Sequence, residues 1–302
     1  MRVTTSLIHD TGVGAIQDQQ SKLLQLQQQV ATGRKAVTPA DDPISTARAL
    51  EVAQSKKLNS QFQTNQGYAK DALGLAENKL VGVKDLITYI REQAVAAGNG
   101  SYSQSERNAV ATDLRSRFDA LLSIANSQDG TGEYVFSGFK GDTRPFSGSL
   151  AGVTYNGDQG ERTLQVSASR VLPVSNSGDE VFMKVPGSSN SLFGVISDFI
   201  ADLENPAASM PAAVSTALTD LDASLDNVLR VQASVGSRVN EVEALESISA
   251  DLDTQYAQTI SRLEDVDYAE AISDLTLEQT FLQAAQQSFL RIANLSLFNF
   301  LN

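Results

Sequence analysis

The feature that most limits the fold is a run of apolar residues, between residues 62 and 97, spaced almost throughout by alternating steps of three and four. Such spacing places every member on one stripe of an α-helix, and a stripe this long is typical of a helix packed against other helices over many turns. The members are Phe62, Ala69, Leu73, Ala76, Leu80, Val83, Ile87, Ile90, Ala94 and Ala97. We therefore expect one long helix from Pro43 to about Ala97.

A short break separates that helix from the next one. Asn99 and Gly100 interrupt the periodic pattern. Ser103 and Glu106 then have the spacing of a capping box, in which each side chain bonds the backbone of the other at a helix start. The helix that follows carries apolar residues at Val110, Leu114, Phe118, Leu121 and Ala125. We expect the two helices to fold back as an antiparallel hairpin.

Helical periodicity returns in the second half of the chain. A short stretch with apolar residues at Leu192, Ile196, Phe199 and Leu203 stops at Asn205 and Pro206. A second stretch of about fifty residues then predicts another long, coiled-coil-like helix. Its apolar residues are Val214, Leu218, Leu221, Leu225, Val228, Val235, Val239, Val242, Leu245 and Leu252.

Between these helical halves the sequence changes to glycine and serine separating short β-type runs. The runs are 134–136, 153–155 and 163–166, and the segment 156–160, Asn-Gly-Asp-Gln-Gly, predicts a hairpin loop joining the last two. No glycine pattern of a phosphate-binding loop occurs. We expect an inserted β-rich unit.

The first helix, expected from Ile16 to Val30, has only a narrow apolar seam on a glutamine-rich background and ends at Gly33. In the connector that follows, Asp42 has the position of a helix cap with Pro43 in the first turn. A calcium site at Asp41 and Asp42 is the alternative, but two adjacent carboxylates fall short of the six or more oxygens that calcium takes.

The last helix is apolar over a broad face. Asp265, Val266 and Asp267 interrupt the preceding helix, and Asp267 with Glu270 predicts the cap of a terminal helix ending near Phe298. Its apolar residues are Ile272, Leu275, Leu282, Phe289, Ile292, Leu295, Leu297 and Phe298. This face exceeds what a two-helix seam requires, and short isolated helices are marginal in water. We therefore expect both chain ends to fold together with assembly.

Charge argues against several kinds of partner. The formal net charge of -13 disfavours nucleic acid and anionic membrane surfaces. Polar residues interrupt the apolar C-terminal stretch, which argues against a membrane span. Residues 1–100 carry 11 basic and 9 acidic residues, whereas residues 201–302 carry 4 basic and 16 acidic ones. Either the two halves attract each other, or both sets of charges lie on solvated faces.

The sequence offers little to an enzyme. It has no cysteine and one histidine, His9, so thiolate nucleophiles, disulfides and cysteine-based zinc sites are excluded, and a histidine-activated nucleophile would need the extreme N-terminal region. A hydrolase using Asp142, Asp158 or Glu161 is a competing hypothesis, but nothing in the sequence brings these acids together. We therefore expect no catalytic site, no metal site and no bound cofactor.

Several motifs resemble those of the bacterial flagellin family, most closely its hook-associated branch called type 3. They are Met1–Val3, Gln28–Arg34, Thr38–Pro43, Gly132–Gly138, Pro145-Phe146, Tyr155–Asp158, Leu263–Ala271 and Leu295–Asn299. The resemblance covers the whole chain, with the terminal thirds most specific. Filament flagellin and an intracellular coiled-coil adaptor are the alternatives.

The resemblance implies a structural protein that joins hook to filament by self-assembly. It implies export through the flagellum's own type III channel without a cleaved signal peptide, neighbouring hook-associated and flagellin subunits, and an export chaperone on the C-terminal region. The family's assembly role falls by position on Ile16, Leu23, Leu26, Val30, Leu275, Leu282, Phe289, Ile292, Leu295 and Phe298.

Together, these patterns predict a mainly α protein with a β-rich insert. Its long antiparallel helices form a coiled-coil-like bundle, flanked by terminal helices that pair on assembly. The expected parts are an N-terminal assembly helix with its connector (1–42), a helical core in two pieces (43–130 and 191–266), a β-rich outer insert (131–190) and a C-terminal assembly helix (267–302).

Overall fold

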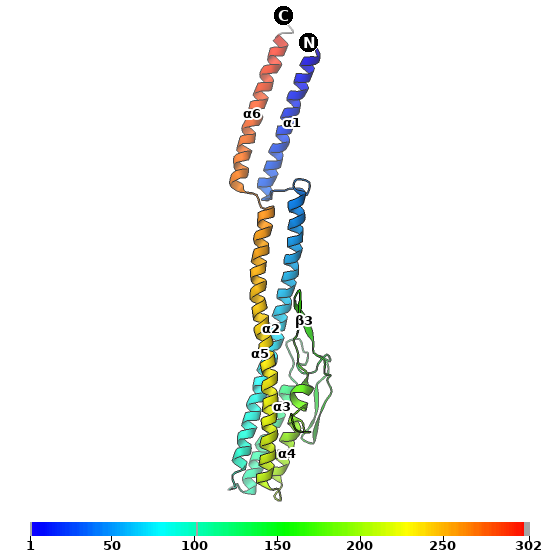
Figure 1. Cartoon of the computed structure of the whole chain (residues 1–302), viewed down its shortest axis with the longest axis vertical. Helices are drawn as coiled ribbons and strands as arrows, with labels where there is room; N and C mark the ends of the chain where they lie inside the picture. The colour runs from blue at the N-terminus through cyan, green and yellow to red at the C-terminus, as the bar shows by residue number, and fades with distance from the viewer. Residues whose placement is uncertain (1, 101, 299–302) are drawn as a thin grey trace. The chain divides into compact units, whose positions relative to one another are not determined.

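The computed structural model describes the backbone of residues 2–100 and 102–298, and the side chains of residues 7, 9–100 and 102–291. Contacts divide the chain into a terminal unit, Met1–Leu58 with Asp251–Asn302, and a central unit, Asn59–Ala250. The helices are α1 (Arg2–Thr32), α2 (Pro43–Ala97), α3 (Gln104–Ala125), α4 (Leu192–Glu204), α5 (Met210–Glu264) and α6 (Tyr268–Phe298), with a π-helical turn η1 (Asp179–Met183) (Figure 1). The strands are β1 (Phe146–Ser149), β2 (Gly152–Tyr155), β3 (Thr163–Ser167) and β4 (Arg170–Pro173).

The central unit is built around the apolar stripe of α2. Every stripe residue from Ala69 to Ala97 is buried, and Phe62 is half-buried. The stripe shares one continuous core with α3, α4 and α5, to which Phe118, Phe199 and Leu221 contribute. Burying each such side chain fully contributes roughly 1.5 to 3 kcal/mol. The predicted mainly α fold with long packed helices is confirmed.

The local signals at the α2–α3 break are also confirmed. Ser103 and Glu106 form the capping box, in which the Ser103 backbone N–H donates to Glu106 Oε2 at 2.7 Å. This hydrogen bond lowers the pKa of Glu106, because it favours the charged carboxylate. Across the hairpin, the Tyr89 hydroxyl donates to Asp113 Oδ2 at 2.9 Å.

The predicted strand pairing of the β-rich insert is wrong. The pairs are β1 with β2, where Phe146 faces Tyr155, and β3 with β4, where Thr163 faces Pro173. The segment 156–160 is therefore not a hairpin loop between β2 and β3. The run 134–136 forms no named strand, and only Tyr134 makes an isolated bridge, to Gln128.

Asp158 explains why the segment 156–160 bends differently. Its carboxylate Oδ1 accepts hydrogen bonds from the backbone N–H groups of Phe139 (2.8 Å) and Gly160 (2.9 Å), and these bonds lower its pKa. The Tyr155 hydroxyl donates to the Asp158 carbonyl at 2.7 Å and to the Phe136 carbonyl at 3.0 Å. The segment is thus bonded to the loop at 136–139, which is distant in sequence.

The insert shares its core with the helices. Phe146 of β1 contacts Phe182 of η1 and Phe193 of α4, with ring centroids 5.2 and 5.4 Å away, and those two rings also stack on each other at 5.8 Å. Phe193 contacts Phe118 of α3 at 5.7 Å. The buried Gln66 amide on α2 donates to the Val166 carbonyl at 2.7 Å. Residues 131–190 therefore belong to the central unit. Our division of the chain into five segments stays a prediction about the part that each segment plays in assembly.

We predict that Gly138→Ala destabilises the central unit by about 2 kcal/mol. Gly138 has a φ of 74°, which disfavours any side chain, and an added Cβ would collide with the Asp158 carboxylate. Urea unfolding measures the loss. The control is Gly74→Ala in α2, where an added Cβ meets no atom within 4 Å and the higher helix propensity of alanine should raise stability. Equal stability of the two variants would contradict this account.

Candidate assembly interface

The two chain ends form one antiparallel helix pair in the terminal unit. Helices α1 and α6 are each 31 residues long and lie side by side (Figure 1). Two contacts fix their register: the Phe289 ring lies over Gly12, and the Tyr268 hydroxyl lies against Gly33. Gly12 and Gly33 are 21 residues apart, as are Tyr268 and Phe289. The helices therefore keep the same register between these two contacts.

The two glycines leave room for these contacts. A Cβ on Gly12 would lie 2.7 Å from the Phe289 ring, which also stacks at a tilt on His9 with 5.1 Å between centroids. Gly33 follows the end of α1 with a φ of 71°, and its N–H donates to the Gln29 carbonyl at 2.8 Å. The sequence predicted the end of α1 at Gly33, but it missed the role of Gly12.

Helix α1 starts earlier than predicted. We expected a helix from Ile16, whereas the structure has α1 from Arg2. Gly12 and Gly14 lower helix propensity in this stretch, so local pattern alone did not extend the helix there. Packing against α6 accounts for the difference, because tertiary contacts override weak propensity.

Seven of the predicted assembly residues have side chains that the structure describes, and all seven lie on the sides of α1 and α6 that face each other. They are half-buried: Ile16, Leu23, Leu26, Val30, Leu275, Leu282 and Phe289. The register places Leu26 level with Leu275, and Val30 level with the buried Ala271. The predicted side chains of Ile292, Leu295 and Phe298 lie outside the described residues. Contacts of all these residues in an assembly stay a prediction.

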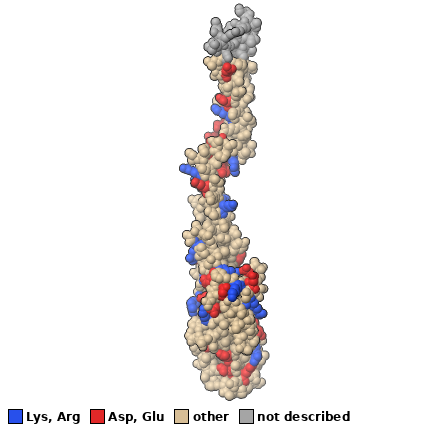
Figure 2. All heavy atoms as spheres, turned by 90° about the vertical axis from the view of Figure 1, so that its right-hand side faces the viewer, with Lys and Arg blue, Asp and Glu red and all other residues tan. Residues whose placement is uncertain are grey.

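The pair leaves much apolar surface uncovered. On α6, Ile272, Leu277, Phe281 and Leu290 are 50 to 60% exposed. At about 100° per residue, Leu277 and Phe281 fall on one side of the paired face, and Ile272 and Leu290 on the other. Residues other than Lys, Arg, Asp and Glu make up most of the visible surface of the described part of this pair (Figure 2). One partner helix is therefore insufficient for α6.

One carboxylate lies in the paired face. Glu278 is half-buried, and its Oε2 is buried without a hydrogen-bond partner among the described residues. The register places it level with Leu23, in the apolar seam. An unpaired polar atom at such a place opposes pairing, because it loses water without gaining a partner.

The connectors at the base of the pair are bonded to each other. The Lys35 N–H donates to the Glu264 carbonyl at 2.7 Å, and the Val266 N–H donates to the Gly33 carbonyl at 3.0 Å. The Asp267 carboxylate accepts from the Ala269 N–H at 2.9 Å, so the predicted cap of α6 is confirmed. The start of α6 is thus held beside the end of α1.

Asp41 and Asp42 bond the backbone. Asp42 Oδ1 accepts from the Ser45 N–H at 3.0 Å, which caps α2 as predicted and lowers the pKa of Asp42. Asp41 Oδ2 accepts from the N–H groups of Val37 and Thr38 at 3.1 and 2.8 Å. These bonds favour capping over the calcium alternative. Within the described residues, no group of three or more potential metal ligands occurs.

The three carboxylates considered for a hydrolase, Asp142, Asp158 and Glu161, lie in different surroundings. Asp158 bonds backbone N–H groups, Glu161 lies 3.9 Å from Arg238, and Asp142 is exposed. No bond or ion pair of the described residues joins these acids into a catalytic pair. His9 contacts Phe289.

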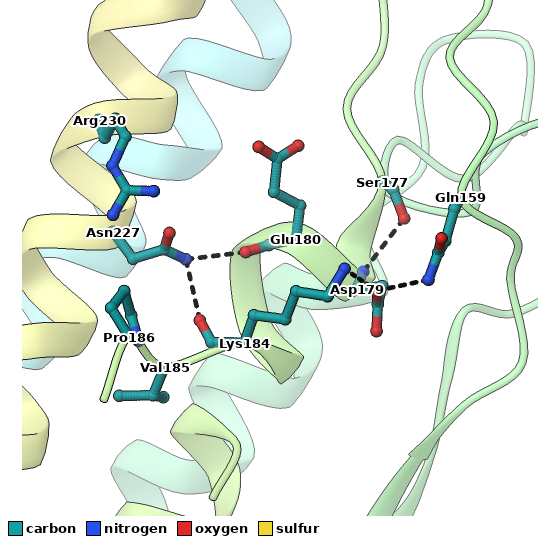
Figure 3. Close-up of a pocket in the computed structure, with 9 residues that line it drawn as sticks. All are labelled: Gln159, Ser177, Asp179, Glu180, Lys184, Val185, Pro186, Asn227 and Arg230. Atoms are coloured by element: carbon teal, nitrogen blue, oxygen red, sulfur yellow. Dashed lines mark hydrogen bonds and ion pairs between the residues drawn. The ribbon is translucent and has the colours of Figure 1, made fainter. Parts of the chain in front are cut away.

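A hollow of about 480 Å³ lies beside η1 (Figure 3). Lys184 pairs with Asp179 at 2.7 Å, and the Gln159 amide also donates to Asp179 at 2.9 Å. The buried Asn227 amide donates to the Glu180 carbonyl at 2.8 Å and so holds η1 against α5. These polar groups bond one another, as expected of a structural contact.

Comparisons with known proteins point to one family. Residues 11–140 match the bacterial flagellin N-terminal helical region, and residues 215–301 match the flagellin C-terminal helical region. Flagellar hook-associated protein 3 of Escherichia coli K12 is 34% identical, and that of Salmonella typhimurium LT2 is 31% identical, each over 99% of both chains. A solved flagellar hook-associated structure from Vibrio parahaemolyticus is 24% identical with a TM-score of 0.69, covering 74% of this chain and all of that one. None of the described helices is both long and apolar enough to cross a membrane.

We predict that Glu278→Leu strengthens the α1–α6 pair. Leucine removes the unpaired carboxylate and extends the apolar seam, so in the assembled protein, where the pair is folded, amides of both helices should exchange roughly fivefold more slowly, the equivalent of about 1 kcal/mol. Hydrogen exchange followed by mass spectrometry measures this. The control is Gln287→Leu, which introduces the same residue at an exposed position of α6 away from the paired face. Equal slowing by both variants would mean that helix propensity, rather than the seam, is responsible.

Proposed function

The chain belongs to the flagellin family, and on that premise we propose that it is the hook–filament junction protein of a bacterial flagellum. The observation that carries the proposal is the pairing of the two chain ends into helices that leave apolar surface for further partners. The full-length similarity to hook-associated protein 3 supports this assignment over filament flagellin. It also argues against an intracellular adaptor, because such a protein would not need to resemble hook-associated protein 3 at both of its ends.

We propose that neighbouring subunits cover the exposed flanks of α6. Leu277 and Phe281 on one flank, and Ile272 and Leu290 on the other, are half-exposed, and burying each contributes roughly 1 kcal/mol. Helices from two neighbours would cover both flanks. In a tube whose wall is made of packed helices, each α6 would have such neighbours on either side. The partners are copies of this chain and neighbouring hook-associated and flagellin subunits.

We infer that both ends fold during assembly rather than before it. The α1–α6 pair has a narrow seam that includes Glu278, whereas the central unit has its own continuous core. Unfolded ends also suit export through a narrow channel, without a cleaved signal peptide. An export chaperone bound to the C-terminal region 267–302 would cover the apolar face of α6 until assembly.

In this proposal the other parts support the helix pair. Segments 43–130 and 191–266 supply the helical wall, and the insert 131–190 lies on its outside. The role is structural, and it requires neither catalysis nor a cofactor. The five-part division is a proposal about function, since the insert packs into the same core as the helices.

Hydrogen exchange on the monomer tests coupled folding. We predict that residues 1–40 and 270–302 exchange fast, whereas Leu80 to Ile90 in the buried stripe are strongly protected. Equal protection of the ends and the stripe would contradict the proposal. The same measurement on assembled protein should show the ends protected.

Truncation tests the role in the flagellum. We predict that removal of residues 270–302 leaves the central unit folded, since its core lies within Asn59–Ala250, but abolishes incorporation at the hook tip. Electron microscopy of purified hook tips reads out incorporation. Normal filaments on such hooks would overturn the proposal.

A point variant tests the same role more finely. We predict that Phe281→Asp lowers incorporation at least tenfold, because it places a charge on an apolar flank. Thr280→Asp is the control, an exposed neighbour that lies between the two flanks. Equal incorporation of both variants would mean that the flank is not an interface.

A further inference from the structure

The chain contains two Asn-Gly pairs, Asn99-Gly100 and Asn156-Gly157. Such a pair can lose ammonia spontaneously, because the backbone nitrogen of the glycine can attack the side-chain amide carbon of the asparagine. Glycine favours this attack, since it has no Cβ beside the nitrogen and its backbone rotates freely. In a folded protein the reaction also requires that the two groups can move into contact. The surroundings of each pair therefore decide whether it reacts.

The first pair lies at the corner between α2 and α3. Helix α2 ends at Ala97, and Gly98, Asn99 and Gly100 are all exposed. Among the described residues, the Asn99 side chain and the Gly100 N–H have no hydrogen-bond partner. A Cβ on Gly100 would meet no atom within 4 Å, so the space around the pair is open. The Gly100 nitrogen and the Asn99 side chain are thus free to approach each other.

The second pair is held in place within the insert. The Asn156 N–H donates to the Pro145 carbonyl at 2.7 Å, and the Asn156 side-chain amide donates to Ser147 Oγ at 2.8 Å. Gly157 is closely packed, because a Cβ at this position would lie only 2.4 Å from the Tyr155 hydroxyl oxygen. Attack by the Gly157 nitrogen would break the side-chain bond and move the packed backbone. Folding therefore protects this pair.

We propose that Asn99 is a site of spontaneous deamidation in the folded protein and that Asn156 is protected from it. The Gly100 nitrogen forms a bond to the Asn99 Cγ, and the side-chain nitrogen leaves as ammonia together with the proton of the Gly100 N–H. The product is a cyclic succinimide. Water then opens one of the two C–N bonds of the ring and leaves an aspartate or an isoaspartate at position 99. This inference does not depend on the proposed function.

Either product changes the corner between the helices. The new carboxylate adds negative charge just beyond the end of α2, where the helix dipole is already negative. An isoaspartate also inserts a methylene group into the backbone and displaces the Asn99 carbonyl, which accepts a hydrogen bond from the Tyr102 N–H at 3.3 Å. Tyr102 is half-buried against the core of the central unit. Conversion should therefore loosen the corner and leave the buried stripe of α2 intact.

Peptide mapping by mass spectrometry tests the inference on the full-length chain. The two asparagines lie on separate tryptic peptides, 92–107 and 141–162, and neither peptide contains another asparagine. At mildly alkaline pH, which favours deprotonation of the attacking nitrogen, Asn99 should convert at least about tenfold faster than Asn156, the equivalent of about 1.4 kcal/mol in activation free energy. In urea, which removes the contacts of the insert, the two asparagines should convert at similar rates.

Gly100→Ala is the matched variant. Its added Cβ enters open space but lies beside the attacking nitrogen, so conversion of Asn99 should be about tenfold slower while the melting temperature stays the same. Gly130→Ala is the control, because it adds the same methyl group at another exposed and open glycine and should leave the rate unchanged. Asn99→Asp reproduces one product, and it should speed amide exchange at the corner without changing exchange in the buried stripe.

Three results would overturn the inference. The first is equal conversion of Asn99 and Asn156 in the folded protein. The second is a Gly100→Ala variant that converts as fast as the parent chain. The third is slow conversion of Asn156 in urea, which would mean that its local sequence, rather than folding, protects it.

Discussion

Incomplete burial at the chain ends is the constraint on which the rest of this structure depends. Helices α1 and α6 pair in register between the contacts at Gly12 and Gly33, yet α6 presents apolar residues on both sides of the paired face. Within the described part of the chain, no helix covers these side chains, which stay 50 to 60% exposed. If neighbouring subunits supply the missing contacts, as we propose, folding of the ends is coupled to polymerisation.

The central unit differs from the chain ends, because its apolar core is buried within one chain. The stripe on α2 is buried by α3, α4 and α5, and phenylalanines from β1 and η1 extend the same core into the insert. Polar bonds such as that from Gln66 to the Val166 carbonyl then fix how the insert attaches. A complete core in the central unit and incomplete burial at the ends are consistent with the export and later assembly that we propose.

The sequence predicted the features that depend on local chemistry. The α2 stripe, the capping box at Ser103 and the caps at Asp42 and Asp267 are decided by spacing within a few residues, and each is confirmed. The strand pairing failed because Asp158 bonds the loop at Phe139, nineteen residues away in sequence. A local pattern carries no information about such a partner.

In the candidate interface, too, the sequence predicted the local features but not the contacts between distant segments. The seam from Ile16 to Val30 was predicted from periodicity, but the need for glycine at position 12 depends on Phe289, at the far end of the chain. Glu278 likewise looks like an ordinary surface residue until the register of the pair places it level with Leu23. Contacts between distant segments are what a single sequence leaves open.

The distance between α1 and α6 before and after assembly tests the central claim most directly. The chain has no cysteine, so spin labels can be attached at Ser21→Cys and Thr280→Cys, two exposed positions that lie nine residues from Gly12 and Phe289 along their helices. Pulsed double electron–electron resonance between the two labels would be recorded on the monomer. It would also be recorded on junctions in which labelled copies are diluted with unlabelled ones. We predict a broad distance distribution in the monomer and one short, narrow distance after assembly. The same narrow distance in the monomer would contradict it.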